Sequence, residues 1–312
     1  MSRMNKSSTI FVAGHRGMVG SAIVRKLEKE GYSNILKRTS EELDLRNQND
    51  VNSFFEEEKP QFVFLAAAKV GGILANSERK GEFLYDNLMI QNNVIHASYK
   101  NSVKKLLFLG SSCIYPKFAK QPMSEDALLT GPLEETNDAY AIAKIVGIKM
   151  CDAYRSQYRC EFISAMPTNL YGPNDNYDLL SSHVLPALLR KTIEAKRKDN
   201  NHIEIWGTGS PLREFLHVDD LADACLFLMQ AYNNPGHINV GSGEEISILE
   251  LLKLIKNIVG YKGALVHDLT KPDGTPRKLM DNSKIESLGW KPQISLEQGV
   301  LQVYNEIKHD FN

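Results

Sequence analysis

Several features are missing from this 312-residue sequence, and each absence excludes a class of protein. No stretch approaches the roughly 20 consecutive apolar residues that a membrane-spanning helix needs. The four cysteines are scattered without a CxxC pair, which excludes a disulfide-rich scaffold, and no His/Cys cluster has zinc-ligand spacing, so we expect no metal. The net charge of −1 argues against binding nucleic acid or an anionic membrane through bulk charge. The N-terminal segment has no signal-peptide pattern, and we therefore expect a reduced, cytoplasmic protein.

The first half of the chain alternates short apolar runs with longer helical patterns. Unbroken apolar runs such as 62–68 are typical of strands that are buried on both faces of a sheet. Alternation at this spacing indicates parallel βαβ units, so the sequence predicts an α/β protein with a doubly wound, Rossmann-type parallel sheet. The expected strands span 9–14, 33–38, 61–68, 104–111 and 160–167, and the expected helices span 18–31, 47–59, about 79–101 and 138–158.

The pattern changes after Pro167. The segment 168–182 is rich in Asn, Asp, Gly and Ser, which is typical of a loop. Ser247 and Glu250 have the spacing of a capping box and predict a helix start. The remaining expected elements are helices at 183–198, 218–232, 246–260 and 296–311, with a strand and turn at 236–243. We expect a Rossmann domain formed by 1–172 and about 215–242, and a smaller mixed α/β substrate lobe formed by about 173–214 and 243–312.

The first expected strand runs directly into the glycine-rich segment AGHRGMVG. Gly14, Gly17 and Gly20 have the spacing GxxGxxG, one residue away from the dinucleotide fingerprint GxGxxG. The first glycine allows a tight turn, the second lets the backbone approach a pyrophosphate, and the third allows close packing of helix on strand. The helix N-terminus adds free N–H groups and a positive partial charge. A glycine-rich turn without a ligand is the alternative, but the position after the first strand favours a dinucleotide.

The end of the second expected strand favours NADP over NAD. An NAD-binding protein places a carboxylate there for the ribose 2′-hydroxyl, whereas this chain has Lys37 and Arg38. Arg16 lies in the glycine loop, so two or three cations are available for a 2′-phosphate. Asp44 is a candidate for the adenine edge. The alternative is that Lys37 and Arg38 are ordinary surface charges.

Two hydroxyls, a thiol and a phenol crowd the end of the fourth expected strand in LGSSCIYPK. The carboxyl ends of strands in a doubly wound sheet face the ligand crevice, so we expect Ser111 there. Tyr140 and Lys144 share one face of the next helix at i, i+4. We expect the ammonium to lower the pKa of the phenol from its ordinary value of about 10 and to make it a proton donor for an alkoxide. A lone YxxxK pair is common by chance, but here it follows a glycine loop and a strand-end serine.

These motifs resemble those of the extended short-chain dehydrogenase/reductases that act on nucleotide sugars. Within that family the chain is similar to the bifunctional epimerase/reductases that convert GDP-4-keto-6-deoxy-D-mannose to GDP-L-fucose. The resemblance therefore implies NADP(H) as the cofactor and a GDP-sugar as the substrate. The matching blocks run from residue 13 to about 280, in the order AGHRGMVGSAI, LAAAKVGGI, LLFLGSSCIYPK, KQPMSED, YAIAKI, MPTNLYGPNDN, SHVLPALLRK, GTGSPLREFLHVDD, INVGSG, VGYKG and KPDGTPRKL.

The resemblance also implies roles for individual residues. Ser111, Tyr140 and Lys144 would serve the reduction, and Cys113 and His183 would be the base and acid that epimerise C3 and C5. Taken alone, a cysteine after a strand is usually a small buried hydrophobe, and a histidine at a helix start is usually a cap or a surface residue. The implied cofactor contacts are Gly14, His15, Arg16, Gly17, Met18, Val19, Gly20, Arg38, Asp44, Leu45, Leu109, Gly110, Ser111, Lys144, Pro167, Asn169, Leu170 and His183.

The matched blocks of the second half supply the implied substrate contacts, which are Lys191, Trp206, Arg213 and Asp273. The two cations can pair with phosphate oxygens, and the indole can pack against the sugar or the base. Asp273 can accept from the N–H edge of guanine, although Pro-Asp-Gly is also a plain turn signal. Arg277 and Lys278 either steer phosphate or face solvent.

The chain departs from the family pattern at two cationic positions. Ser40 stands where a second basic residue is common, so a weaker preference for NADP over NAD is expected. Lys191 stands where an arginine is common, which gives a point charge in place of a fork. The family forms homodimers through two long helices, here near 79–101 and 138–158. Apolar residues such as Ile142 and Val146 suit either a core or an interface.

Three other functions use some of the same motifs. Nucleotide-sugar 4-epimerases and 4,6-dehydratases share the sheet and YxxxK. A 4-epimerase has no use for a Cys113/His183 pair, and a dehydratase needs a carboxylate where SSCIYP offers a thiol. A non-catalytic dinucleotide-binding redox sensor is the third alternative, and the presence of both Tyr140 and Lys144 argues against it.

Overall fold

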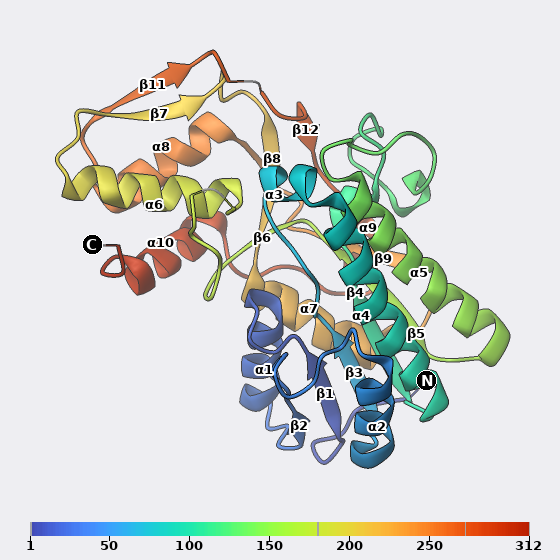
Figure 1. The fold of residues 1–312 in the computed structure, drawn as a ribbon. Coiled ribbons are helices and arrows are strands. Elements are labelled where there is room, and N and C mark those ends of the chain that lie inside the picture. The colour runs from blue at the N-terminus through green and yellow to red at the C-terminus, as the bar shows by residue number, and fades with distance from the viewer. Residues whose placement is uncertain (1, 180, 272, 312) are drawn as a thin grey trace.

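A sheet of six parallel strands forms the centre of the protein (Figure 1). The computed structural model describes residues 2–179, 181–271 and 273–311. The strand order is β2-β1-β3-β4-β5-β9, and all neighbouring pairs are parallel. The strands are β1 (Ile10–Ala13), β2 (Ile35–Leu36), β3 (Phe62–Leu65), β4 (Lys105–Leu109), β5 (Phe162–Pro167) and β9 (His237–Val240). The order reverses at β1, as it does in doubly wound folds, which confirms the predicted Rossmann-type class.

Helices cover both faces of this sheet and give the molecule two hydrophobic layers. One layer lies under α1 (Met18–Lys29) and α7 (Val218–Ala231), and the other lies under α2 (Gln48–Glu58), α4 (Lys80–Lys100) and α5 (Asp138–Tyr158). Alternate residues of β1 serve the two layers: Ile10 and Val12 pack in the first, and Phe11 and Ala13 in the second. Burial on both faces is why these strands have unbroken apolar sequences.

Side-chain caps mark some of the helix starts. Asn47 accepts a hydrogen bond from the N–H of Asn49 at 3.0 Å and caps α2, as its position predicted. Ser247 likewise caps α8 (Ile248–Val259) by accepting from the N–H of Glu250 at 3.1 Å. The short helix α3 (Ile73–Glu78) was not predicted, because six residues are too few to show a helical period.

The second half builds a smaller lobe around β8 (Leu212–His217). This strand pairs antiparallel with β10 (Glu245–Ser247) and parallel with β12 (Arg277–Lys278) and β6 (Asn169–Tyr171). The prediction of a loop throughout 168–182 was therefore wrong at β6, whose pairing partner is distant in sequence and invisible to local composition. The lobe also contains β7 (His202–Trp206), β11 (Ala264–Asp268), α6 (Val184–Arg197) and α10 (Leu296–Ile307), whereas α9 (Ser283–Ser287) packs on β9 of the central sheet.

The chain crosses between the two parts several times. After β8 it continues through α7 and returns to the central sheet as β9, so β8 lies next to elements of both parts. The domain boundaries expected from the sequence stay a prediction. In the ranges that the structure describes, no helix is both long and apolar enough to cross a membrane, and the four cysteines are free thiols.

Candidate active site

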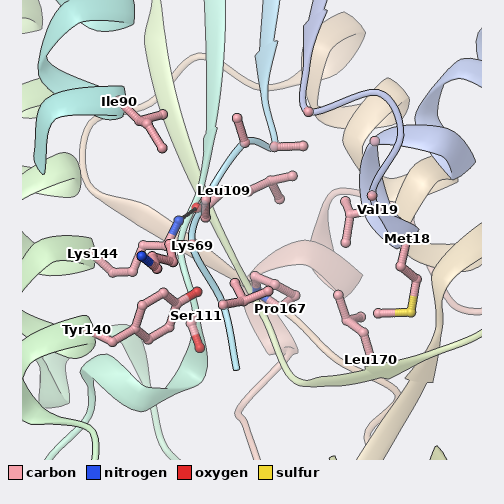
Figure 2. Close-up of a pocket in the computed structure, with 18 of the residues that line it drawn as sticks. Met18, Val19, Lys69, Ile90, Leu109, Ser111, Tyr140, Lys144, Pro167 and Leu170 are labelled. Carbon is pink, nitrogen blue, oxygen red and sulfur yellow. Dashed lines mark hydrogen bonds between the residues drawn. The ribbon is translucent and has the colours of Figure 1, made fainter. Parts of the chain in front are cut away.

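A cavity of about 580 Å³ lies at the carboxyl ends of β1, β3, β4 and β5. This is the edge at which doubly wound sheets bind ligands. Figure 2 shows Ser111, Tyr140 and Lys144 on one side of it and Met18, Val19 and Leu170 on the other. All the predicted cofactor contacts line this cavity except His15 and Arg16. Ser111, Tyr140, Lys144 and His183 line it together with the glycine loop.

Two glycines of the loop are required by geometry. Gly14 has φ +85°, and a Cβ there would lie 2.7 Å from the Cα of Ala67. A Cβ on Gly20 would lie 2.0 Å from the carbonyl oxygen of Gly14. Gly17 is the N-cap of α1, whose first N–H groups therefore face the cavity without a side-chain cap. This arrangement fits a pyrophosphate, as the spacing predicted.

Of the cations expected at a 2′-phosphate (Arg16, Lys37 and Arg38), Arg38 is the one that lines the cavity. Its guanidinium is paired with Glu58 and lies 5.4 Å from the centroid of the Phe54 ring. Lys37 pairs instead with Glu28 at 3.3 Å, and it does not line the cavity. The hydroxyl residue Ser40 does line it. The cationic cluster expected for a 2′-phosphate thus reduces to Arg38 with a neighbouring serine.

Asp44 also lines the cavity, but its carboxylate is already engaged. Arg46 contacts it at 2.9 Å, and this hydrogen-bonded pair lowers the pKa of Asp44. Asp86 lies between Arg46, at 3.4 Å, and Lys69, at 2.8 Å. Asp44, Arg46, Asp86 and Lys69 therefore form one connected network of ion pairs.

The Tyr140/Lys144 pair is in place, but its electrostatics differ from the prediction. Lys144 donates a hydrogen bond from Nζ to the carbonyl oxygen of Leu109 at 2.8 Å, and its Nζ lies 5.6 Å from the centroid of the Tyr140 ring. Burial raises the pKa of Tyr140, and it lowers the pKa of Lys144 to about 8. The expectation of a lowered phenol pKa was wrong, because desolvation by burial is the largest influence on Tyr140. Tyr140 is consequently a neutral phenol that can donate a proton.

Cys113 lies one layer behind the cavity wall. It follows β4 in a short 3-10 turn, Ser112–Ile114, is only 8% exposed, and does not line the cavity itself. Ser111 Oγ accepts a hydrogen bond from the N–H of Cys113 at 3.4 Å. Burial raises the pKa of the thiol, whereas Ser111 and the charges of Lys278 and Lys144 act in the opposite direction. The Cys113 thiol therefore lies near Ser111 and Lys144 and also near Lys278.

His183 reaches the cavity from the other part of the molecule. It is the N-cap of α6, its side chain makes no capping hydrogen bond, and the residue is exposed. Desolvation by the surrounding protein lowers its pKa, so the imidazole is mostly neutral near pH 7. The structure brings this ring to the wall that carries Ser111 and Tyr140.

Arg213 and Lys278 form a second group of cations, and the charge of Lys278 acts on Cys113. They sit opposite each other in the parallel pairing of β8 with β12. Arg213 donates to the carbonyl oxygens of Leu212, at 2.8 Å, and Thr275, at 2.6 Å. Burial lowers the pKa of both cations, and neither has an ion pair in the described parts of the chain. Lys278 was expected either to steer phosphate or to face solvent, and its burial favours the first alternative.

The other implied substrate contacts lie farther out on the lobe and do not line the cofactor cavity. Trp206 is 58% exposed, and the Nζ atoms of Lys191 and Lys271 lie 5.3 and 5.6 Å from its ring centroid. Asp273 accepts from the N–H of Thr208 at 2.9 Å and from its hydroxyl at 2.8 Å. The carboxylate holds the turn between β7 and β8, so its proposed contact with guanine stays a prediction.

Sequence analysis did not predict the wall that follows β3. Ala66, Ala67, Ala68 and Lys69 line the cavity, and the buried side chain of Asn87 fixes them. Asn87 accepts from the N–H of Lys69 and donates to its carbonyl oxygen, both at 3.0 Å. The rule that placed Ser111 at the end of β4 applies equally to the end of β3. The further lining residues that were missed include Leu43, Ile90, Ser112, Thr168 and Leu221.

Comparison with known proteins agrees with this geometry. The sequence pattern of the NAD dependent epimerase/dehydratase family matches residues 10–241. This chain belongs to the NAD dependent epimerase/dehydratase family. The resemblance to nucleotide-sugar enzymes of the extended short-chain dehydrogenase/reductase type is thereby confirmed.

Relatives in this family are similar over nearly the whole chain. "Putative GDP-L-fucose synthase 2" of Arabidopsis thaliana is 64% identical over 301 residues, which are 96% of this chain and 92% of the relative. "GDP-L-fucose synthase" of Escherichia coli (strain K12) is 52% identical, with 95% of each chain covered. The solved structure of MlghC, a GDP-mannoheptose C4 reductase from Campylobacter jejuni with NADP bound, has a TM-score of 0.91 at 44% identity, covering 98% of this chain and 99% of that one.

Proposed function

We propose that this chain is a GDP-L-fucose synthase. It epimerises C3 and C5 of GDP-4-keto-6-deoxy-D-mannose and reduces the 4-keto group with NADPH, which yields GDP-L-fucose and NADP⁺. The observation that carries this function is the gathering of Ser111, Tyr140, Lys144 and His183 around one cavity, with the Cys113 thiol directly behind it. Relatives named GDP-L-fucose synthase, at 52 to 64% identity, support the choice of substrate.

The epimerase half of the reaction needs a base, an acid and a group that stabilises an enolate. The 4-keto group acidifies the protons on C3 and C5, and their removal places negative charge on O4. Ser111 and Tyr140 donate hydrogen bonds to that oxygen. Cys113 removes the ring proton as a thiolate, and His183 returns a proton to the other face, which inverts the centre.

The reductive half uses the same oxygen. NADPH fits the cradle of Gly14, Gly17 and Gly20 and supplies the hydride that C4 receives. Tyr140 keeps its proton before the reaction because burial raises its pKa, and it passes that proton to O4 as negative charge develops there. Lys144 lies against the same ring and would hold the ribose of the bound cofactor.

The substrate's pyrophosphate is the natural partner of Arg213 and Lys278. Both side chains are half-buried, and both lack a carboxylate partner in the described residues. Lys278 acts on the Cys113 thiol through its charge, and Arg213 lies opposite Lys278 in the pairing of β8 with β12. An anion of two or more charges would offset the cost of burying them. Lys191 and Trp206 lie farther along the lobe, where the sugar or the nucleoside would contact them.

A second candidate function is C4 reduction without epimerisation. Structural neighbours at 42 to 44% identity are named as reductases of GDP-heptoses. The deep position of Cys113 and its raised pKa would suit an enzyme that makes little use of the thiol. The charges of Lys144 and Lys278 counteract that shift, which favours the bifunctional reaction.

Deuterium exchange separates these two functions. We expect the wild-type enzyme to exchange both C3 and C5 protons of the keto sugar nucleotide in D₂O, measured by NMR without added NADPH. Cys113→Ser should slow exchange by about 100-fold or more, since a hydroxyl is a far weaker base than a thiolate. Cys160→Ser, at a half-buried position outside the cavity, is the matched control and should exchange like the wild type.

Two results would contradict the proposal. Full exchange by Cys113→Ser would remove the thiol from its role as base. NADPH oxidation by a wild-type enzyme that exchanges neither proton would make the chain a C4 reductase.

We also propose that the enzyme is a homodimer through α4 and α5. Tyr85 on α4 and Ile142 and Val146 on α5 are 62, 44 and 37% exposed, although the two helices otherwise pack on the central sheet. Replacing Ile142 with Glu should therefore shift the sedimentation coefficient to that of a monomer. A dimer that survives both Ile142→Glu and Val146→Glu would use another surface.

A further inference from the structure

Glu214 is a fully buried carboxylate at the junction between the central sheet and the smaller lobe. Its Oε1 accepts hydrogen bonds from the N–H of Gly243 at 2.8 Å and from Nδ2 of Asn282 at 3.2 Å. Its Oε2 accepts from the N–H of Met280 at 3.0 Å. These donors lie in the turn after β9 and in the segment between β12 and α9, so the carboxylate joins β8 to two segments that are distant in sequence.

The backbone of Glu214 faces the cofactor cavity at the same time. Its carbonyl oxygen accepts from Nδ2 of Asn169 at 2.8 Å and from the hydroxyl of Thr168 at 3.4 Å, and both of these residues line the cavity. The turn after β9 packs directly on the carboxylate, because a Cβ on Gly241 would lie 2.2 Å from Oε1. Glu214 therefore touches the ends of β5 and β9 as well as the segment after β12.

This carboxylate has no role in the chemistry assigned above. It does not line the cavity, and it has no ion pair in the described part of the chain. Burial of a carboxylate is costly, and the three N–H donors offset that cost. Its neighbours in sequence and in space are the two substrate cations: Arg213 precedes it on β8, and Met280 lies two residues after Lys278.

We propose that Glu214 is a positioning residue for the pyrophosphate site. It holds the β12 segment against β8, so that Lys278 stays opposite Arg213 and both face the substrate. The inference rests on the proposed function, because it assumes that this pair of cations binds the GDP moiety. Without the carboxylate, the N–H of Met280 loses its partner, while Leu279 and Asp281 keep theirs in Gln121 and Met123, so the Lys278 ammonium shifts relative to the Arg213 guanidinium.

The test is the binding of GDP to the full-length enzyme, measured by calorimetry. Glu214→Gln keeps the size of the side chain but turns one acceptor into a donor that faces a backbone N–H. We expect the Kd for GDP to rise by about tenfold or more, which corresponds to one lost charge-assisted hydrogen bond in the site. The Kd for NADPH should change by less than about twofold, because the backbone carbonyl that meets Asn169 and Thr168 is retained.

Asp220→Asn is the matched control. Asp220 is also buried, and it also accepts from two backbone N–H groups, those of Gln293 at 3.1 Å and Ile294 at 2.9 Å. These donors lie in the link between α9 and α10, away from the two cations. Both variants should lower the melting temperature, but only Glu214→Gln should weaken GDP binding.

Asn282→Ala is a second variant that tests the same role if Glu214→Gln does not fold. It removes a single donor to Glu214, and it should raise the Kd for GDP by about threefold.

The outcomes are distinct. Equal GDP affinity in the wild type, Glu214→Gln and Asn282→Ala would overturn the positioning role while leaving the proposed function intact. Equal losses in Glu214→Gln and Asp220→Asn would show a general effect of stability and would also overturn it. A wild-type enzyme that does not bind GDP would contradict the proposed function itself, and the inference would fall with it.

Discussion

The cations at the two ends of the active site differ in what surrounds them. At the nucleotide end of the cofactor cavity, Arg38 is paired with Glu58, and Arg46 is paired with Asp44. On the proposed substrate side, Arg213 and Lys278 are half-buried with no carboxylate partner among the described residues. The first group is neutralised before any ligand arrives, whereas the second remains available to an anion.

This difference indicates where binding energy comes from. A paired cation must exchange or share its carboxylate before it helps a ligand, so its net contribution is small. An unpaired cation that the fold holds in place contributes more binding free energy, because the incoming anion is its first charged partner. We therefore expect substitutions on the substrate side to have larger effects than equivalent substitutions around the cofactor.

The largest effect is expected at Arg213. Arg213→Met should raise the Kd for GDP by about 100-fold, because a forked donor fixed by two backbone carbonyls is lost from a half-buried site. Arg46→Met, which removes a cofactor-side cation that two carboxylates already hold, should change the Kd for NADPH by less than about twofold. Calorimetric titration of both variants measures the contrast, and equal effects would abolish the distinction between the two ends.

A smaller effect is expected at Arg38. Arg38→Gln should raise the KM for NADPH by about tenfold and leave the KM for NADH unchanged, since only NADPH carries the 2′-phosphate. Lys37→Gln is the control, because Lys37 is exposed and lies outside the cavity. Steady-state rates with the two cofactors provide the readout. An unchanged ratio of NADPH to NADH use in Arg38→Gln would contradict this role of Arg38 and would indicate that Ser40 or Arg16 determines the selectivity.

The smallest effect concerns pH. The pKa of Lys144 is lowered to about 8, so its charge is lost as pH rises through that value. Single-turnover reduction should therefore fall by several-fold between about pH 7 and about pH 8.5. Proton exchange needs the Cys113 thiolate, whose thiol has a raised pKa, and the His183 imidazolium, which has a lowered pKa. Taken as independent groups, the fraction of enzyme that carries both forms is constant at each pH between the pKa of His183 and the pKa of Cys113. Exchange should fall less than reduction over this range, because Lys144 is only one of the two cations whose charge lowers the pKa of the Cys113 thiol, and an equal fall would contradict the assignment.

The sequence predicted the cofactor side of the site well because its signals are local. A glycine loop after a strand, a serine at a strand end and an i, i+4 pair each depend on a few neighbouring residues, and the structure brings them together around one cavity. The error in this region was electrostatic: the pKa of Tyr140 depends on burial, which the YxxxK motif does not encode.

The substrate side was harder to predict because long-range pairing builds it. Lys278 lies opposite Arg213 only through the register of β12 with β8, and β12 is two residues long. Glu214 likewise has donors at 243, 280 and 282, so nothing in its neighbourhood in sequence marks it as an anchor. β6 was missed for the same reason, since its partner is β8.

The identity of the reduced product tests the central claim most directly. We predict that the wild-type enzyme, given GDP-4-keto-6-deoxy-D-mannose and NADPH, forms GDP-L-fucose, identified by the proton couplings of its pyranose ring in NMR. A GDP-6-deoxyhexose that retains the D configuration at C5 would show reduction without epimerisation. That result would contradict the roles given to Cys113 and His183.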